Sequence, residues 1–201
     1  MTLQHPGVLA GRLVTLEPLA HEHRDGLVEA VRDGELWSLW YTRIPEPEGM
    51  EAEIERRLEL QRRGSMLPFT TRRADTGRII GMTTFMNIDH DTPRVEIGST
   101  WNAAGAQGTG TNPESKLLLL QHAFEVWGCP AVEFRTDFHN HRSREAIARL
   151  GAKQDGILRS QQRMPAGYVR DAVVFSIIVS EWPAVRLALE TRVARHLVRT
   201  A

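Results

Sequence analysis

The sequence predicts one α/β domain built on a mixed, largely antiparallel central sheet that is flanked by helices. Three strand-like segments at 66–71, 78–88 and 94–101 follow one another with turn residues between them, which predicts an antiparallel meander. Helical and strand-like segments then alternate, and that order requires crossover connections within the same sheet. The length of 201 residues suits a single domain over 1–201, with the segment 181–201 as an appended C-terminal helix.

The remaining elements are predicted from hydrophobic periodicity and from residues that begin or end helices. Before the meander we expect a strand at 12–16 and helices at 21–32 and 51–63; after it, a helix at 112–127, a strand at 131–136, a helix at 140–150, strands at 153–162 and 169–180, and a helix at 181–199. The 112–127 helix has the clearest bounds, because Asn112 can cap it, Pro113 fits its first turn and Gly128 ends it. Its many apolar residues, Val126 among them, predict deep burial.

Composition narrows the class of function. Lysine plus arginine total 25 and aspartate plus glutamate total 25, so there is no general attraction to nucleic acid or to acidic membranes. Cys129 is the only cysteine, which excludes an internal disulfide and fits a reducing compartment. The N-terminus has no signal-peptide pattern, and no apolar run approaches the ~18 residues that span a bilayer. We therefore expect a cytoplasmic protein.

A glycine-containing loop at 107–112 is the most informative stretch. It joins a strand to the most apolar helix, and the free N–H groups at a helix start bind phosphate well. The lysine of a nucleoside triphosphate loop is absent, because Thr111 follows Gly110, and Pro113 stands where a dinucleotide fingerprint needs its third glycine. The alternative is an ordinary turn that precedes a buried helix.

At this point the sequence resembles a known family. Gln107-x-x-Gly110-x-Asn112 resembles the Gln/Arg-x-x-Gly-x-Gly/Ala signature of GCN5-related N-acetyltransferases (the GNAT superfamily), with Asn112 departing from the usual glycine or alanine. Three further segments at matching spacings are similar to its RimJ/RimL-like ribosomal-protein N-terminal acetyltransferase branch: Glu96-Ile97-Gly98, Asn140-x-x-Ser143 and Leu150-Gly151-Ala152.

The resemblance implies a GNAT-type sheet and direct acetyl transfer from acetyl-CoA to a primary amine in a ternary complex. The co-substrate would be acetyl-CoA (coenzyme A), without a metal. The residues that this resemblance assigns to cofactor binding are Thr100, Trp101, Gln107, Gly108, Thr109, Gly110, Thr111, Asn112, Asn140 and Ser143. The other possibility at Asn140 is a plain helix cap. Arg142 and Arg144 could meet phosphates or be solvated.

Two residues are candidates for catalysis. Many members of the family carry a tyrosine as the acid at the position of Ile147. In the resembled RimL-like branch the serine of the Asn-x-x-Ser motif has that role, so the resemblance implies that Ser143 assists the leaving thiolate. Glu96 is the candidate base that takes the proton of the ammonium group, or else it pairs with an arginine across the sheet. A thioester is already reactive, so positioning can supply most of the rate.

The acceptor is left open by the sequence. Trp37, Trp40 and Tyr41 are the substrate-binding candidates, because the matching region of the family covers the acceptor pocket, and core residues are the alternative. Glu46 and Glu48 could attract an amine or be solvated. A protein N-terminus, a metabolite and an amine-bearing antibiotic all fit. The pair His139 and His141 lacks a third metal ligand, and Cys129 lacks a nearby base.

A homodimer is expected from the resembled branch and from an apolar stripe in the last helix. The stripe consists of Val185, Leu189, Val193 and Leu197, and burial within one chain is its alternative. Two rival functions stay open: a non-catalytic acyl-CoA-binding sensor, which the presence of Ile147 in place of the tyrosine leaves possible, and a nucleotide-binding regulatory domain.

Overall fold

The central sheet has the predicted class and is larger than expected by one short strand. The computed structural model describes residues 3–200 (the side chains of 199 and 200 excepted), and within them an eight-stranded sheet has the order β1-β2-β3-β4-β5-β6-β8-β7. Neighbouring strands are antiparallel except β5 and β6, which are parallel. The bounds are β1 Leu9–Ala10, β2 Val14–Pro18, β3 Met66–Arg73, β4 Ile79–Asp89, β5 Arg94–Asn102, β6 Ala131–Asp137, β7 Lys153–Arg163 and β8 Val169–Ile178.

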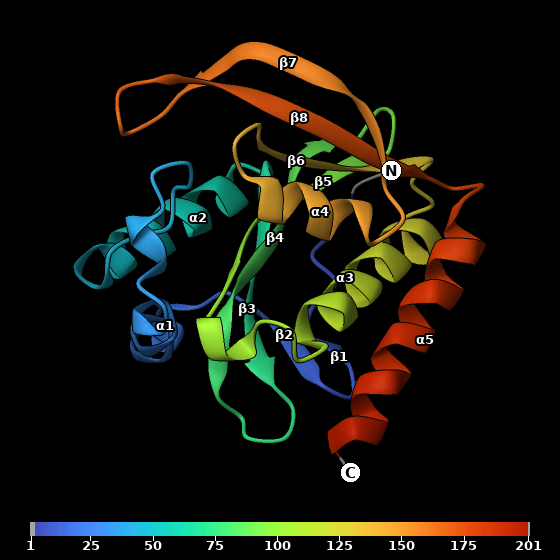
Figure 1. Ribbon diagram of the computed structural model, residues 1–201, viewed down its shortest axis with the longest axis horizontal. Coiled ribbons are helices and arrows are strands. Elements are labelled where there is room, and N and C mark those ends of the chain that lie inside the picture. Colours follow the sequence, from blue (N-terminus) through green and yellow to red (C-terminus); the bar gives the residue numbers. More distant parts are fainter. Residues whose placement is uncertain (1–2, 201) are drawn as a thin grey trace.

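Helices cover both faces of the sheet. In Figure 1, α1 Arg24–Arg32 and α2 Met50–Arg62 lie on one side of the sheet, and α3 Thr111–Gln121, α4 His141–Ala148 and α5 Trp182–Thr200 lie on the other. Short turns join them: η1 His21–His23, η2 Leu36–Ser38, η3 Pro47–Gly49, η4 Ala104–Ala106 and the π-helical η5 His122–Val126. Two apolar cores result, one between the sheet and α3, α4 and α5, the other beneath α1 and α2. No helix within residues 3–200 is long and apolar enough to cross a membrane.

The start of α3 differs from the prediction. Gly110, not Asn112, is the capping residue, and its φ of +86° turns the chain into the helix two residues earlier than expected. Asn112 therefore lies inside the first turn. The other end also differs, because the helix continues as the π-turn η5, which rotates the side chains relative to an α-helix. Val126, which was expected on the buried face, is 61% exposed.

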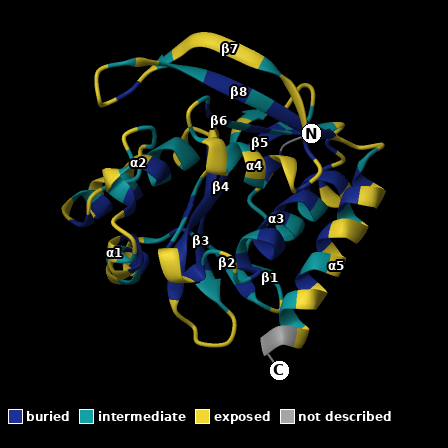
Figure 2. Cartoon of the chain, viewed as in Figure 1, coloured by how far each residue is buried: buried dark blue, intermediate teal, exposed yellow. Residues whose placement is uncertain are grey.

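The last two strands of the sheet differ in burial. Figure 2 shows β8 largely buried and β7, at the edge of the sheet, exposed along most of its length. The edge strand carries mainly polar and charged residues, which discourages pairing with another chain.

The apolar stripe of α5 is covered within the monomer. Val185, Leu189 and Val193 are at most 7% exposed, and the helix packs beside α3. The competing outcome is therefore the observed one, because α3 offers the apolar surface that a second subunit was expected to supply. The homodimer loses the structural reason on which its prediction rested.

Candidate functional site

The site is built where β5 and β6 cease to pair. Their parallel register runs only from Arg94 opposite Ala131 to Glu96 opposite Glu133. Beyond Glu96, no residue of β5 within the described chain pairs with β6, so the facing strand edges keep unpaired backbone groups. In α/β sheets, ligands bind beyond the carboxyl ends of parallel strands, and both strands run toward this region.

The loop that follows β5 offers backbone donors. Gly108 and Gly110 have φ values of +78° and +86°, and the hydroxyls of Thr109 and Thr111 both donate to the carbonyl of Ala106, at 2.7 and 3.0 Å. The hydroxyls thus brace the loop from within. Over the part of the chain that is described, the backbone N–H groups of 108–112 have no protein acceptor. Several N–H groups at a helix start suit an anion such as a diphosphate.

Neighbouring elements hold this loop in place. The amide of Gln107 donates to the carbonyl of Asn102 at 3.0 Å and accepts a hydrogen bond from Arg142 of α4. Gly110 packs against α5, because a Cβ atom there would lie 2.7 Å from the ring of His196. Gln107 therefore acts as a brace of the loop, and Arg142 lies beside it. The appended helix is part of the loop's support.

A bulge in β5 decides where two predicted cofactor residues point. Ser99 and Thr100 together lie opposite Thr83 of β4, and Ser99 has a φ of +45°. The extra residue turns the side chain of Thr100 toward α3 and puts Trp101, 4% exposed, into the core beneath α1 and α2. Their side chains thus lie above and below the sheet. Only their backbone lies at the strand edge that faces β6.

Glu96 pairs with an arginine across the sheet, which is one of the two alternatives foreseen for it. Its carboxylate is 6% exposed, accepts a hydrogen bond from Asn87 at 2.7 Å, and lies 3.4 Å from Nε of Arg135 on β6. Burial raises the pKa of Glu96, and the hydrogen bond from Asn87 and the charge of Arg135 oppose that rise. A carboxylate with a raised pKa is a better proton acceptor than an exposed one. Its ion pair with Arg135 keeps it oriented.

Asn140 and Ser143 begin α4 together. The side chain of Asn140 caps the helix by accepting a hydrogen bond from the backbone N–H of Ser143 at 3.0 Å. Its amide NH₂ and the half-buried Ser143 hydroxyl have no partner among the described residues. Ile147 is 8% exposed and belongs to the core. Arg144 lies over the ring of Phe138, with its guanidinium carbon 4.9 Å from the centroid, so its charge is engaged within the β6–α4 segment.

The three aromatic candidates for the acceptor do not form one group. Trp40 is 52% exposed and its ring lies 5.3 Å from Tyr41, 5.5 Å from His139 and 5.2 Å from Tyr168. The hydroxyl of Tyr168 donates to buried Asp137 at 2.7 Å. These aromatic side chains connect the segment before α2 to the β6–α4 loop and to the β7–β8 turn. They form a wall near the carboxyl end of β6.

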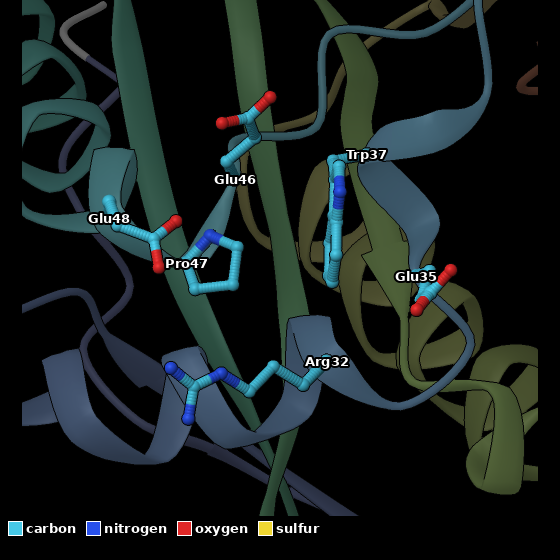
Figure 3. Close-up of a pocket in the computed structure, with 6 residues that line it drawn as sticks. All are labelled: Arg32, Glu35, Trp37, Glu46, Pro47 and Glu48. Atoms are coloured by element: carbon cyan, nitrogen blue, oxygen red, sulfur yellow. The ribbon is translucent and has the colours of Figure 1, made fainter.

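Trp37 lies in a separate surface pocket of about 430 Å³, drawn in Figure 3. The pocket is lined by Arg32 at the end of α1 and by the α1–α2 connection: Glu35, Trp37, Glu46, Pro47 and Glu48. Three carboxylates beside an indole ring give it a negative balance, despite Arg32. Asp33 joins this region to η4, since it accepts hydrogen bonds from the backbone N–H groups of Ala104 and Gly105.

The sequence reasoning missed the partners of the site. Asn87 and Arg135 reach Glu96 only through strand pairing, and no local signal marks them. Lys116 had a signal, because its spacing from Leu119, Leu120 and Ala123 puts it on the buried face of α3. Among residues 3–200, no three His, Cys, Asp or Glu side chains are grouped to hold a metal. Cys129 is buried, and burial raises its pKa to about 11.

Comparisons with known proteins agree with this geometry. A family model described as "Acetyltransferase (GNAT) domain" matches residues 13–153. A chain from T. thermophilus assigned as an acetyltransferase is 32% identical with a TM-score of 0.83, over 94% of this chain and 98% of that one. A GCN5-related N-acetyltransferase from Brucella melitensis is 27% identical with a TM-score of 0.81, over 95% and 86%.

A more distant likeness concerns the branch. RimJ from Mycobacterium smegmatis, in complex with CoA-disulfide, has a TM-score of 0.75 over 92% of both chains, and its 22% identity shows the fold alone. No protein of curated function matches the sequence. The family model spans most of the chain, and its match includes β5, the loop at 107–112 and the start of α4. The chain therefore belongs to the GNAT family and is an acyl-CoA-dependent acetyltransferase.

Proposed function

We propose that this protein moves the acetyl group of acetyl-CoA directly to a primary amine within a ternary complex. One observation carries the proposal. The unpaired N–H groups of 108–112 lie at the end of β5, whose free edge leads back to the buried carboxylate of Glu96. The site thus has, along one line, an anion-binding loop, an extended strand edge and a base. In that order they match the diphosphate, the amide-bearing arm and the reacting end of acetyl-CoA.

The residues have separate roles in binding. The N–H groups of 108–112 hold the diphosphate, and the unpaired backbone of β5 beyond Glu96 hydrogen-bonds to the amides of the pantetheine arm. The free amide NH₂ of Asn140 donates to that arm from the other side, while its oxygen caps α4. The braces at Gln107 and His196 keep the loop preformed, which lowers the entropy lost on binding.

In the reaction the acceptor nitrogen gives up two protons and the C–S bond breaks. Glu96 takes the first proton, from the ammonium group, directly or through water, and the neutral amine then attacks the thioester carbonyl. The C–S bond breaks as the new C–N bond forms, and the second proton passes from the nitrogen to the thiolate, so that CoA leaves as its thiol. Ser143 donates a hydrogen bond to the leaving sulfur. A thiol with a pKa near ~8.5 is a fair leaving group, so this help is modest.

The acceptor is an amine on a protein N-terminus or on a small molecule. The negative balance of the pocket around Trp37 and the aromatic wall at Trp40 support a cationic acceptor. One solved relative, from Vibrio cholerae, is assigned as a ribosomal-protein-serine acetyltransferase, and it is 19% identical with a TM-score of 0.73. A ribosomal-protein N-terminus is therefore one acceptor to test.

The test is the release of CoA thiol with a panel of amines: N-terminal peptides, amino compounds and amine-bearing antibiotics. We expect at least one amine to raise thiol release well above the rate of acetyl-CoA alone. Tight acetyl-CoA binding without release on any amine would favour the alternative, a non-catalytic acyl-CoA-binding sensor. Ile147 in place of the family's tyrosine is the observation that keeps this alternative open.

Location and assembly belong to the same proposal. A single buried cysteine supports a reducing, cytoplasmic setting. A homodimer stays a prediction that rests on the family branch alone, since α5 has its apolar stripe covered by α3. Light scattering at micromolar concentration measures it, and a monomer mass would refute it.

A further inference from the structure

Two buried cations reach the β5 bulge from the two faces of the sheet. Arg57 of α2 donates from Nη2 to the carbonyl of Ser99 at 3.2 Å. Lys116 of α3 donates from Nζ to Oγ1 of Thr100 at 2.8 Å and to Oγ1 of Thr83 at 3.0 Å. Ser99 and Thr100 are consecutive and form the bulge itself. The two helices thus hold the same point of the strand.

Neither cation is balanced in the way that buried charges usually are. Lys116 is 5% exposed, and no carboxylate lies within ion-pair distance of it in the described chain. Arg57 pairs with Glu53 at 2.7 Å, but its Nη1 atom is buried and has no partner. Burying a cation without full compensation destabilises a fold. Their presence at one strand segment therefore calls for a role beyond packing.

The bulge lies on β5 between Glu96 and the loop at 108–112. The diphosphate loop at 108–112 follows the end of β5, and Glu96 lies further back on the same strand. An extended arm between them passes the unpaired edge of Gly98, Ser99 and Thr100. Negative charge develops on the carbonyl oxygen during attack, and fixed donors with positive charge behind them stabilise it.

We propose that Arg57 and Lys116 are positioning residues, which clamp the Ser99–Thr100 bulge of β5 so that its backbone edge is fixed against the acetyl thioester. The inference rests on the proposed function, because it needs the acetyl group to lie beside β5. Both residues act through the strand and have no contact with substrate. The guanidinium of Arg57 also adds positive potential at the same point.

The test compares Arg57→Met and Lys116→Met with matched controls on one good amine. Arg56→Met removes an arginine that binds the same Glu53 but is half-exposed and does not reach β5. Thr84→Val removes a buried hydroxyl of β4 that binds only the carbonyls of Leu67 and Phe85. We expect kcat to fall roughly tenfold or more in both test variants, with KM for acetyl-CoA changed less than about threefold. The controls should keep the parent's kcat.

Stability separates positioning from a structural role. Replacing an unpaired buried lysine by an apolar chain of similar size should leave Tm unchanged or raised, although kcat falls. Arg57→Lys keeps the charge, so it should retain more kcat than Arg57→Met and less than the parent, and it stands in if Arg57→Met does not fold. If the parent is active and the Arg57 and Lys116 variants have the same kcat as the control variants, the proposed clamp is wrong. A parent without activity on any amine would overturn the proposed function and the clamp with it.

Discussion

Nε of Arg135 on β6 lies 3.4 Å from Oε2 of Glu96 on β5. Glu96 belongs to the last residue pair of the two strands, opposite Glu133, and Arg135 lies two residues further along β6, so the ion pair spans the point at which the parallel ladder ends. It sets the orientation of the proposed base while leaving its second oxygen for another partner. The proposed role of Glu96 as a base can therefore be tested separately from its ion pair with Arg135.

Glu96→Gln should change the pH profile more than the fold. Burial raises the pKa of Glu96, so the parent's rate should rise with pH as this carboxyl loses its proton at a pH above its ordinary pKa. The variant should be slow near neutral pH and recover at high pH, where amines deprotonate in water. The measurement is a pH–rate profile of both proteins on one amine. If the variant follows the parent at every pH, Glu96 serves only the ion pair.

Ser143→Ala should lower kcat by about ten- to a hundred-fold, less than the ~10²–10⁴ of a full general acid. The hydroxyl has no protein partner among the described residues, so its removal leaves no buried group unpaired. Stopped-flow or steady-state thiol release measures the change. Full activity in this variant would mean that the thiolate leaves without help.

Asn140→Asp distinguishes a helix cap from a ligand. Aspartate caps as well as asparagine, so the free energy of unfolding should change by less than about 1 kcal/mol. The variant lacks the amide donor and adds a negative charge, and the Kd of acetyl-CoA should therefore increase. Calorimetry on the parent and the variant measures both the Kd of acetyl-CoA and the free energy of unfolding. An unchanged Kd would leave Asn140 as a cap and nothing more.

Gly108→Ala is a cleaner probe of the phosphate loop than any change at Gly110. Both glycines have left-handed backbone, but a Cβ atom at Gly108 meets no protein atom within 4 Å, whereas one at Gly110 strikes His196. Gly110→Val would disturb α5 as well as any ligand. Gly108→Ala puts a Cβ atom on left-handed backbone, so it should cost about 1–2 kcal/mol of stability, and it should weaken acetyl-CoA binding. Binding equal to the parent's would show that no ligand approaches this part of the loop.

Lys116→Met should stabilise the protein most at low pH. Burial lowers the pKa of Lys116 from 10.5 to about 7, so between these values the unfolded chain binds more protons than the folded one. The free energy of unfolding of the parent then rises with pH across that range. Below about pH 7 the folded protein carries the full cost of burying the charged lysine. The increase in the free energy of unfolding caused by Lys116→Met should be larger at about pH 6 than at about pH 9, by at least ~1 kcal/mol. Urea unfolding at both values measures it, and a pH-independent gain would contradict the shifted pKa.

Local patterns predicted the elements and the loop, because both depend on neighbours in sequence. The order of helices and strands was correct apart from the short β1, and the loop at 107–112 does join β5 to α3. The cap of α3 shifted to Gly110, because its left-handed backbone cannot be read from composition. Contacts between residues that are distant in sequence could not be predicted from local patterns. Asn87, Arg135 and Arg57 act through strand register and helix packing, and α5 found its partner in α3 rather than in a second subunit.

The proposed reaction transfers an acetyl group directly from acetyl-CoA to an amine. The most direct measurement follows an isotopically labelled acetyl group by mass spectrometry, with CoA thiol counted in the same reaction. We expect the label on the amine, one thiol released for each product formed, and no label on the protein. Label retained in acetyl-CoA with every amine, or label accumulating on the protein, would contradict the account.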